Sequence, residues 1–386
     1  MKTLLDMADR TPASRERYVD LLRALSIVVV VFGHWLAAVV VWRDGAIGGH
    51  NALDVVDGMW ALTWVLQVMP LFFFVGGFAN LKTWRAMRAK GADYTEYLQT
   101  RVARLMKPTA IFIAVWMVLT YLLENASALP ADALRAATQL MGGPLWFLGV
   151  YLVVVTVAPA MVMLHERFRV TAVAGLGFAA AAIDFARIVF EVPGIGLLNF
   201  AVVWMFVHQL GFFYADGTFN RKGRGFFAAL TAVGFSGLVL LTNIGVYSRS
   251  MVGVGDGAVS NNAPPSVCIC FLAMAMIGAA MLVRPAASRM LERRRVWAAT
   301  IGVNTVIMTA YLWHLSAMVL TVLVIYPLGW PQPEAGTPAW WALRPLWLAI
   351  LTLFLIPFVA AFGRFERPRR RTPRRHPSTY SPAGGV

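Results

Sequence analysis

The sequence predicts an all-α fold, a polytopic membrane bundle of about ten transmembrane helices, and three observations lead to this prediction. Of the 386 residues, 59% are hydrophobic and only 14% are charged, which is too few charges to cover a surface that faces water. The mean hydropathy of the chain is +0.65. Ten apolar stretches follow one another, each close to the length that crosses a hydrocarbon core of about 30 Å. These features exclude a soluble globule, a disordered chain and a disulfide scaffold.

The predicted helices lie at residues 21–42, 59–81, 108–123, 145–164, 170–190, 197–214, 226–247, 264–283, 300–326 and 340–362. None of these ranges alternates between apolar and polar residues as a strand does, and backbone groups in lipid must pair within their own segment. We therefore expect helices and no strand. The third range is shorter than the others and leaves room for a helix that starts upstream of it.

The positions of the basic residues predict the orientation of the chain in the cell membrane, because Lys and Arg collect in cytoplasmic loops. With the N-terminus in the cytoplasm, the outer loops and helix ends hold only five of the 34 Lys and Arg residues, namely Arg43, Arg135, Arg187, Arg249 and Arg344. We therefore expect both termini in the cytoplasm. Residues 1–363 are predicted to form one membrane domain, and residues 364–386 a basic, disordered cytoplasmic tail.

The net charge of +15 bears on the partners of the protein. In a soluble protein such a charge would indicate nucleic acid, but here the basic residues lie at the inner membrane edge, where they attract anionic lipid. The tail carries seven Arg residues between Arg364 and Arg375. We expect anionic lipid, and no nucleic acid, as the partner of this tail.

Polar residues inside the first predicted helix are the strongest candidates for function, because polar groups are costly in lipid. Arg23 and His34 are 11 residues apart, which places them within about 20° of one helical face and about 16 Å apart along the axis. Asp20 lies near the same face and can pair with Arg23. This stripe predicts a site that runs from the cytoplasmic mouth to a deep imidazole. The alternative is that His34 bonds to another helix and Arg23 reaches a lipid phosphate.

Two further segments add candidates. Gly77 follows Gly76 in a phenylalanine-rich stretch where another backbone or a ligand can approach, and Pro70 is expected to free a backbone carbonyl there. Arg101 and Arg104 are three residues apart at the cytoplasmic edge and are expected side by side. This spacing suits the binding of a phosphate by two guanidiniums, and it equally suits lipid headgroups.

The ninth predicted helix holds His314 at mid-membrane depth, with Tyr311 three residues before it. Asn304 is expected on the same face as Tyr311, because seven residues make about two turns. Each of these side chains has a polar contact between helices as its alternative role. Cys268 and Cys270 are interpreted as packed free thiols. No metal is expected, because the sequence contains no set of Cys, His or carboxylate residues with the spacing of a metal site.

Several motifs follow in order along the chain: the Arg-x10-His from Arg23 to His34, the phenylalanine-rich segment at 73–78, the Arg-x-x-Arg at 101–104, and the Trp-Phe-Leu and Tyr-Leu-Trp-His runs at 146–148 and 311–314. Together they resemble the motifs of acyltransferase family 3, integral membrane enzymes that modify sugars, glycolipids and antibiotics. The resemblance extends over nearly the whole chain. One departure is Gly76, where the family usually has Ser.

The resemblance implies a membrane acyltransferase that takes an acyl group, expected to be acetyl, from cytoplasmic acyl-CoA and passes it to a hydroxyl of a glycan or glycolipid. It implies His34 as the essential residue, with Arg23, Arg101 and Arg104 in support. His34 would act as a base or as an acyl-carrying nucleophile, and both routes stay open. The outer loops 43–58 and 248–265 have room for the acceptor. A multi-pass transporter or proton-coupled carrier is the alternative function.

Overall fold

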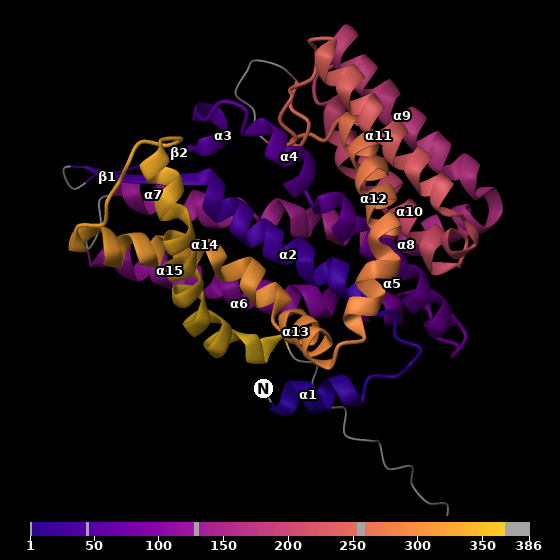
Figure 1. Cartoon of the computed structure of the whole chain (residues 1–386), viewed down its shortest axis with the longest axis horizontal. Coiled ribbons are helices and arrows are strands. Elements are labelled where there is room, and N and C mark those ends of the chain that lie inside the picture. Colours follow the sequence, from indigo (N-terminus) through magenta and orange to yellow (C-terminus); the bar gives the residue numbers. More distant parts are fainter. Residues whose placement is uncertain (1, 44–45, 127–130, 253–258, 367–386) are drawn as a thin grey trace, which may run out of the picture.

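The computed structural model describes residues 2–43, 46–126, 131–252 and 259–366, and it is a bundle of long helices (Figure 1). Ten helical segments within these residues are long and apolar enough to cross a membrane, which confirms the predicted fold class and number of spans. The protein is therefore a multi-pass membrane protein. The predicted basic tail lies, apart from its first three residues, outside the described residues.

The spanning segments are formed by the longer helices of the chain. These are α2 (Arg17–Ala37), α4 (Trp60–Leu66) with α5 (Met69–Arg88), α6 (Tyr94–Asn125), α7 (Ala131–Gly142) with α8 (Leu145–Phe168), α9 (Val170–Val189), η1 (Ile195–Leu198) with α10 (Asn199–Ala215), α11 (Arg224–Asn243), α12 (Val267–Leu291), α14 (Ile307–Ile325) and α15 (Pro338–Phe362). Shorter helices are α1 (Lys2–Asp9), α3 (Ala52–Val55) and α13 (Arg294–Asn304). The third span begins at Tyr94, well upstream of the apolar stretch that predicted it.

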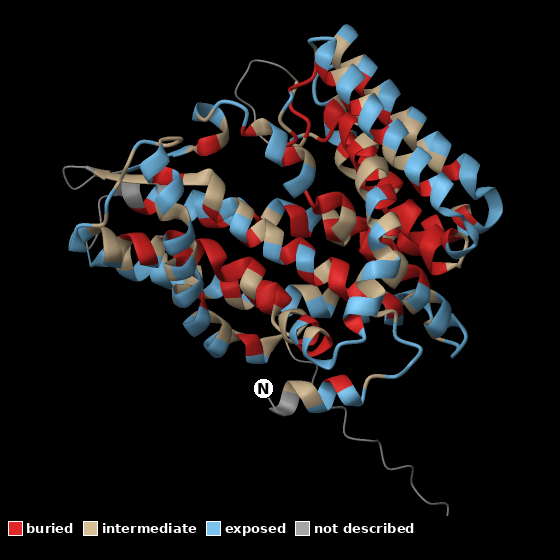
Figure 2. Ribbon diagram, viewed as in Figure 1, coloured by how far each residue is buried: buried red, intermediate tan, exposed pale blue. Residues whose placement is uncertain are grey.

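The described helices divide into a buried centre and a periphery that faces outward (Figure 2). In the most apolar windows of α14 and α10, 72% and 61% of the residues are buried, against 17% in α6, α9 and α15. The peripheral helices expose large apolar side chains such as Phe178 and Leu353, as expected where lipid is the solvent. The polar residues of α2 and α14 that face inward therefore have protein, not lipid, around them.

A short hairpin follows the first spanning helix, and here the prediction of no strand was wrong. Strands β1 (Ala38–Arg43) and β2 (Ala46–Asn51) pair antiparallel, with Ala38 opposite Asn51. Helix α2 therefore ends at Ala37 and not at residue 42. The physical reason is the run of three valines at 39–41, since β-branched side chains favour an extended backbone while keeping the sequence as apolar as a helix.

The second spanning segment is broken into α4 and α5 at Gln67 and Val68. Pro70 lies in the first turn of α5, where its missing N–H has no helical partner to lose. The expectation that Pro70 frees a carbonyl inside a helix was therefore wrong. The break instead leaves Gln67 just before the start of α5, with its side chain toward a cavity described below.

The ninth predicted helix is also two helices, because α13 ends at Asn304 and α14 begins at Ile307. Asn304 and Tyr311 consequently belong to different helices, and their predicted shared face was wrong. Glu366, which follows α15, caps the new N-terminus: its carboxylate accepts hydrogen bonds from the backbone N–H groups of Met308 and Thr309, each at 3.0 Å. Burial raises the pKa of the Glu366 carboxyl above its usual value. The cap fixes where α14 starts.

Gly77 lies where α5 crosses α10. A Cβ atom built on Gly77 would lie 2.0 Å from the carbonyl oxygen of His208, and one on Gly211 would lie 2.1 Å from the carbonyl oxygen of Phe74. The two backbones approach this closely only because both positions lack a side chain. Gly77 therefore serves helix packing, which is one of the two roles that the sequence suggested.

Candidate active site

His34 and His314 meet inside the bundle, although 280 residues separate them in the sequence. Nδ1 of His34 lies 2.8 Å from Nε2 of His314. His34 lies in the last turn of α2, and His314 lies two turns into α14, which packs against α2. His314 is completely buried, whereas the side chain of His34 is accessible. The structure thus joins two candidates that the sequence suggested separately.

Backbone contacts determine where the protons lie on the two neutral rings. Nδ1 of His314 is 2.5 Å from the carbonyl oxygen of Tyr311. A carbonyl can only accept, so this Nδ1 carries the proton, and Nε2 of His314 is an acceptor. Nδ1 of His34 must then donate to that Nε2, which leaves Nε2 of His34 with a free lone pair. A general base or a nucleophile requires such a lone pair.

Two further hydrogen bonds hold the histidine pair in place. The indole N–H of Trp35 donates to the carbonyl oxygen of His314 at 2.9 Å. The hydroxyl of Tyr311 donates to the carbonyl oxygen of Pro144 at 2.6 Å, and this bond ties α14 to the start of α8. Trp35 and Tyr311 are both buried. The predicted candidate Tyr311 therefore orients the His314 ring through its carbonyl and ties α14 to the start of α8 through its hydroxyl.

Two cavities meet at His34. The first, called the amide cavity here, has a volume of about 270 Å³, and the side chains of Asn51, Gln67 and Asn262 line it. The second, called the apolar cavity, has a volume of about 710 Å³ and lies between the hairpin, α7 and α14. His34 and Trp146 line both cavities. Because Nδ1 of His34 faces His314, the Nε2 edge is the one left to the cavities.

The outer loops that the sequence suggested for an acceptor contribute to the amide cavity. Asn51 and Leu53 come from the first loop, and Val252 and Asn262 come from the second. The predicted loops and the predicted imidazole therefore share one space. Gln67, which sequence reasoning missed, completes the polar wall, and the only signal for it was an amide inside an apolar stretch.

At the opposite end of α2, Arg23 belongs to a network that the sequence predicted in part. Its Nη2 donates to Oδ1 of Asp20 at 3.1 Å, which is the expected ion pair. Its Nε donates to Oδ1 of Asn304 at 2.6 Å, a partner that the sequence did not suggest. Arg15 also donates to Asp20, at 2.6 Å, and this hydrogen bond raises the pKa of the Arg15 guanidinium. Arg23 is thus held at the mouth by α2 and α13 together.

Arg101 is anchored by two buried side chains. Its Nη2 donates to the side-chain oxygen of Asn80, and the amide nitrogen of Asn80 donates to Nε2 of His208 at 2.9 Å. Asn80 and His208 are both fully buried. This chain of contacts ties the start of α6 to α5 and α10. Arg101 therefore has a structural task whatever it binds.

Arg104 has different surroundings from Arg101. The two arginines therefore do not have the same role, although their spacing predicted two guanidiniums side by side. Its side chain is exposed and forms no hydrogen bond to any residue that the structure describes. It is close enough to Arg23 and to Glu366 to interact with both electrostatically. Of the two, Arg104 is the guanidinium that is free to take an anionic ligand.

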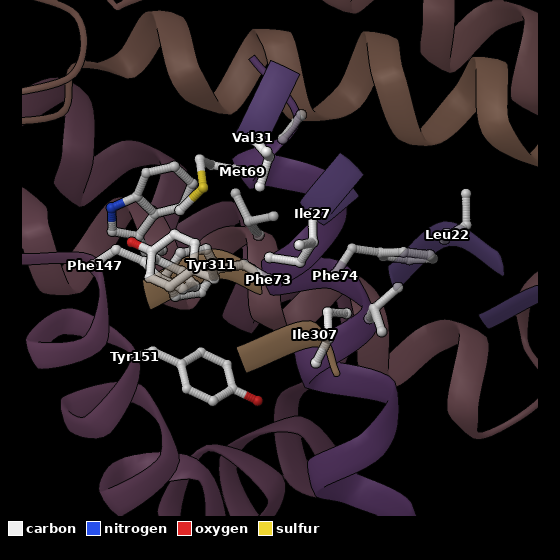
Figure 3. Close-up of a cluster of buried hydrophobic side chains, with 14 of the residues drawn as sticks. Leu22, Ile27, Val31, Met69, Phe73, Phe74, Phe147, Tyr151, Ile307 and Tyr311 are labelled. Atoms are coloured by element: carbon white, nitrogen blue, oxygen red, sulfur yellow. The ribbon is translucent and has the colours of Figure 1, made fainter. Parts of the chain in front are cut away.

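Apolar side chains surround the stretch of α2 between Arg23 and His34 (Figure 3). Ile27 and Val31 of α2 pack with Phe73 of α5, and further members come from α8 and α14. A molecule that reaches from the arginines to His34 has to run along this apolar stretch.

The remaining candidates do not join the site. Cys268 and Cys270 are buried free thiols, as predicted. Within the ranges that the structure describes, no three His, Cys, Asp or Glu side chains are grouped as a metal site would require.

In a comparison with protein families, residues 16–364 fit the acyltransferase family 3 model, described as an acyltransferase domain. The matched range contains both ends of α2, the histidine pair and both cavities. Comparison with curated proteins and with solved structures found no match.

Proposed function

Since the chain belongs to acyltransferase family 3 and is a membrane acyltransferase, we propose that it transfers an acyl group, expected to be acetyl, from cytoplasmic acyl-CoA to a hydroxyl of a carbohydrate or glycolipid. The observation that carries this proposal is the unprotonated Nε2 of His34 where two cavities meet. Family membership favours this enzyme over the transporter that the sequence left as an alternative.

His34 acts as the base in the proposed reaction. Its Nε2 accepts the proton of the acceptor hydroxyl while the hydroxyl oxygen attacks the carbonyl carbon of the thioester, which typically contributes roughly 10²–10⁴-fold. The hydrogen bond from Nδ1 of His34 to Nε2 of His314 keeps the His34 ring in its orientation. When His34 gains a proton, this acceptor nitrogen lies beside the positive charge that develops on its ring. As the C–S bond breaks, the leaving thiolate takes the proton from Nε2. The products are the ester and CoA, and the histidine pair returns to its starting state.

A covalent route uses the same nitrogen. Nε2 of His34 attacks the thioester carbonyl carbon, the C–S bond breaks, and CoA leaves as its thiolate from an acyl-imidazolium that keeps its Nδ1 proton. The acceptor hydroxyl then attacks the acyl carbon, the bond to Nε2 breaks, and the hydroxyl proton is taken up by the thiolate, which gives the ester, CoA and the starting imidazole. The two routes differ when no acceptor is present. Only the covalent route releases a stoichiometric burst of CoA under that condition, which a thiol reagent measures in a rapid-mixing experiment.

The donor's phosphates are proposed to dock at the inner end of α2. Arg104 is exposed with its hydrogen-bonding capacity unused, and Arg23 lies within electrostatic range of it. Charge-assisted hydrogen bonds from guanidinium to phosphate are among the strong contacts of this kind. The distance from Arg23 to His34 along α2 is about 16 Å, which the narrow pantetheine arm of CoA has to cover along the apolar stretch.

The test uses purified protein in lipid nanodiscs with acetyl-CoA labelled in the acetyl group and a glycoside as the acceptor. We expect a labelled glycoside ester from the wild type and none from His34→Ala. Val28→Ala is the matched control, because Val28 lies on α2 and is exposed on its outer side. Undiminished transfer by a folded His34→Ala protein would show that the reaction uses another group.

A further inference from the structure

The amide cavity and the apolar cavity meet at one imidazole but differ in chemistry. We infer that the acceptor is an amphipathic molecule anchored in the bilayer, with its hydroxylated head in the amide cavity and its apolar chain in the apolar cavity. The inference rests on the proposed function and names the acceptor class for it. A soluble sugar would fill only the smaller of the two spaces.

Unused hydrogen-bonding atoms mark the amide cavity as a place for hydroxyl groups. Nε2 of Gln67 donates to Oδ1 of Asn262 at 3.1 Å, and this pairing fixes the orientation of both amides. Oε1 of Gln67 and Nδ2 of Asn262 form no hydrogen bond to the residues that the structure describes. One is an acceptor and the other a donor, so together they match hydroxyls, which do both. Gln67 is 94% buried, but its Oε1 is not among the fully buried polar atoms without a partner, so this oxygen keeps accessible surface in the cavity, where a ligand hydroxyl can donate to it.

The amide wall is built on anchored backbone. The backbone N–H of Met251 donates to the hydroxyl of Thr63 at 2.9 Å, which joins the outer loop to α4. Asn261, the neighbour of Asn262, is fully buried and donates to the carbonyl oxygens of Ser248 and Ser250 at 2.6 and 3.0 Å. The two amides are therefore held before a ligand arrives, which reduces the cost of ordering them on binding.

The lining of the apolar cavity is mostly aliphatic and aromatic, and its polar members besides His34 are His50, Asn51 and Gln139. One face of α14, with Leu315, Met318 and Val319, forms its wall, and Leu140 of α7 and Trp146 of α8 lie across from it. Its volume of about 710 Å³ is within the range of pockets that hold a whole small molecule. An acetyl group, with three heavy atoms, has no need of such a space.

The rim of the apolar cavity reaches the outer surface of the bundle. Leu140 and Trp146 both line the cavity and are 39% and 37% exposed near the start of the fourth spanning segment. A molecule that already lies in the bilayer can thus enter sideways with its chain. Acyl-CoA cannot use this entrance, because its nucleotide is charged and stays in water. The lateral entrance is therefore open to a membrane-anchored acceptor and closed to acyl-CoA, and on this ground we assign the apolar cavity to the acceptor's chain.

The test compares methyl β-D-glucoside with octyl β-D-glucoside as acceptors for labelled acetyl-CoA, using the protein in nanodiscs of fixed lipid content. Val319→Trp fills the apolar cavity from a half-buried position, and Leu320→Trp adds the same side chain at the next residue, which is exposed and outside the cavity. Partitioning of the glycosides into lipid is the same with either variant because the lipid content is fixed, so a difference between the variants reports on the cavity.

We expect Val319→Trp to raise the KM for octyl glucoside about tenfold or more, equivalent to at least ~1.4 kcal/mol of lost binding, and to leave the KM for methyl glucoside unchanged. Leu320→Trp should change neither. Gln67→Leu should raise both KM values by a similar factor, because both acceptors share the head. A second cavity variant is Gly48→Leu, since a Cβ atom at Gly48 has no atom within 4 Å and is therefore added without a clash.

Three results would overturn the inference. The first is a KM for octyl glucoside that neither Val319→Trp nor Gly48→Leu changes. The second is a Val319→Trp protein whose preference shifts among acyl-CoA chain lengths instead, which would assign the apolar cavity to the donor. The third is equilibrium binding of radiolabelled octyl glucoside that is the same in the wild type and both variants. This binding measurement needs no turnover, so an enzyme that binds octyl glucoside through the cavity but fails to acetylate it would refute the proposed function and not the inference.

Discussion

His314 determines which nitrogen of His34 is free to react. Its Nε2 lies 2.8 Å from Nδ1 of His34, and its own Nδ1 is held by the carbonyl oxygen of Tyr311, so toward His34 it can only accept. A neutral imidazole here takes the place that a carboxylate has beside the histidine of a hydrolytic triad. A neutral partner stabilises a protonated His34 less than a carboxylate would. This arrangement suits a base that must return its proton within the same turnover.

The first prediction concerns His314 as a positioning residue. His314→Leu removes the acceptor for Nδ1 of His34, and kcat should fall roughly 10²-fold or more with little change in either KM. His314→Gln should recover part of kcat, because the amide oxygen lies near the position of the lost Nε2 and also accepts. Steady-state kinetics for both substrates provide the measurement. Equal kcat values for the Leu and Gln variants would mean that His314 only fills space.

The second prediction separates the two arginines of α6. Arg104→Ala should raise the KM for acetyl-CoA roughly 10- to 100-fold, the cost of one lost charge-assisted contact, and leave the thermal unfolding of the protein unchanged. Arg101→Ala should lower the unfolding temperature as well, because it leaves the side-chain oxygen of the buried Asn80 without its partner. Donor titration and a thermal melt in the same detergent measure both effects. If neither variant changes the KM for acetyl-CoA, the two arginines do not bind the donor, and their alternative role as contacts of lipid headgroups holds.

The third prediction tests the crossing of α5 and α10. Gly77→Ala places a methyl group 2.0 Å from the carbonyl oxygen of His208, so the helices must separate, at a cost of about 1–3 kcal/mol or more. Gly149→Ala is the control, because no atom lies within 4 Å of a Cβ atom there and Ala favours a helix. Unfolding temperatures should fall for the first variant only. A Gly77→Ala protein as stable as the wild type would show that the crossing tolerates a side chain.

The sequence was sufficient to predict the spans and one stripe of the site. Apolar length identified the ten helices, and the eleven-residue spacing on α2 identified Arg23 and His34 as residues of one face. The sequence predicts such a shared face within a single helix because the helical period alone decides which residues lie on the same face.

The contacts between helices could not be predicted in the same way. The pairs of His34 with His314, and of Arg23 with Asn304, each join residues about 280 positions apart, and no local pattern relates them. The breaks at Gln67 and after Asn304 were missed because one or two polar residues within an apolar stretch do not lower its mean hydropathy enough to end a predicted span. Those breaks matter for function, since one presents Gln67 to the amide cavity and the other lets Asn304 reach Arg23.

The last prediction concerns the sides from which the substrates arrive. Arg23 and the exposed Arg104 lie at one end of the site, whereas His34 lies in the last turn of α2, beside cavities formed by the outer loops. With the orientation that the basic loops predict, the donor should act from the cytoplasmic side and the acceptor from the outer side or from the bilayer.

Sealed vesicles of known orientation decide this point, because acetyl-CoA and methyl glucoside do not cross a membrane readily. In inside-out vesicles, acetyl-CoA added outside with methyl glucoside trapped in the lumen should give product, because each substrate then reaches its own side of the site. In right-side-out vesicles, acetyl-CoA added outside should give product only after detergent opens the membrane. Cleavage of an N-terminal tag by added protease verifies the orientation of each preparation. Equal yields when both substrates are confined to the cytoplasmic face would refute opposite-side access, since the apolar stretch between Arg23 and His34 would then have to admit the acceptor as well.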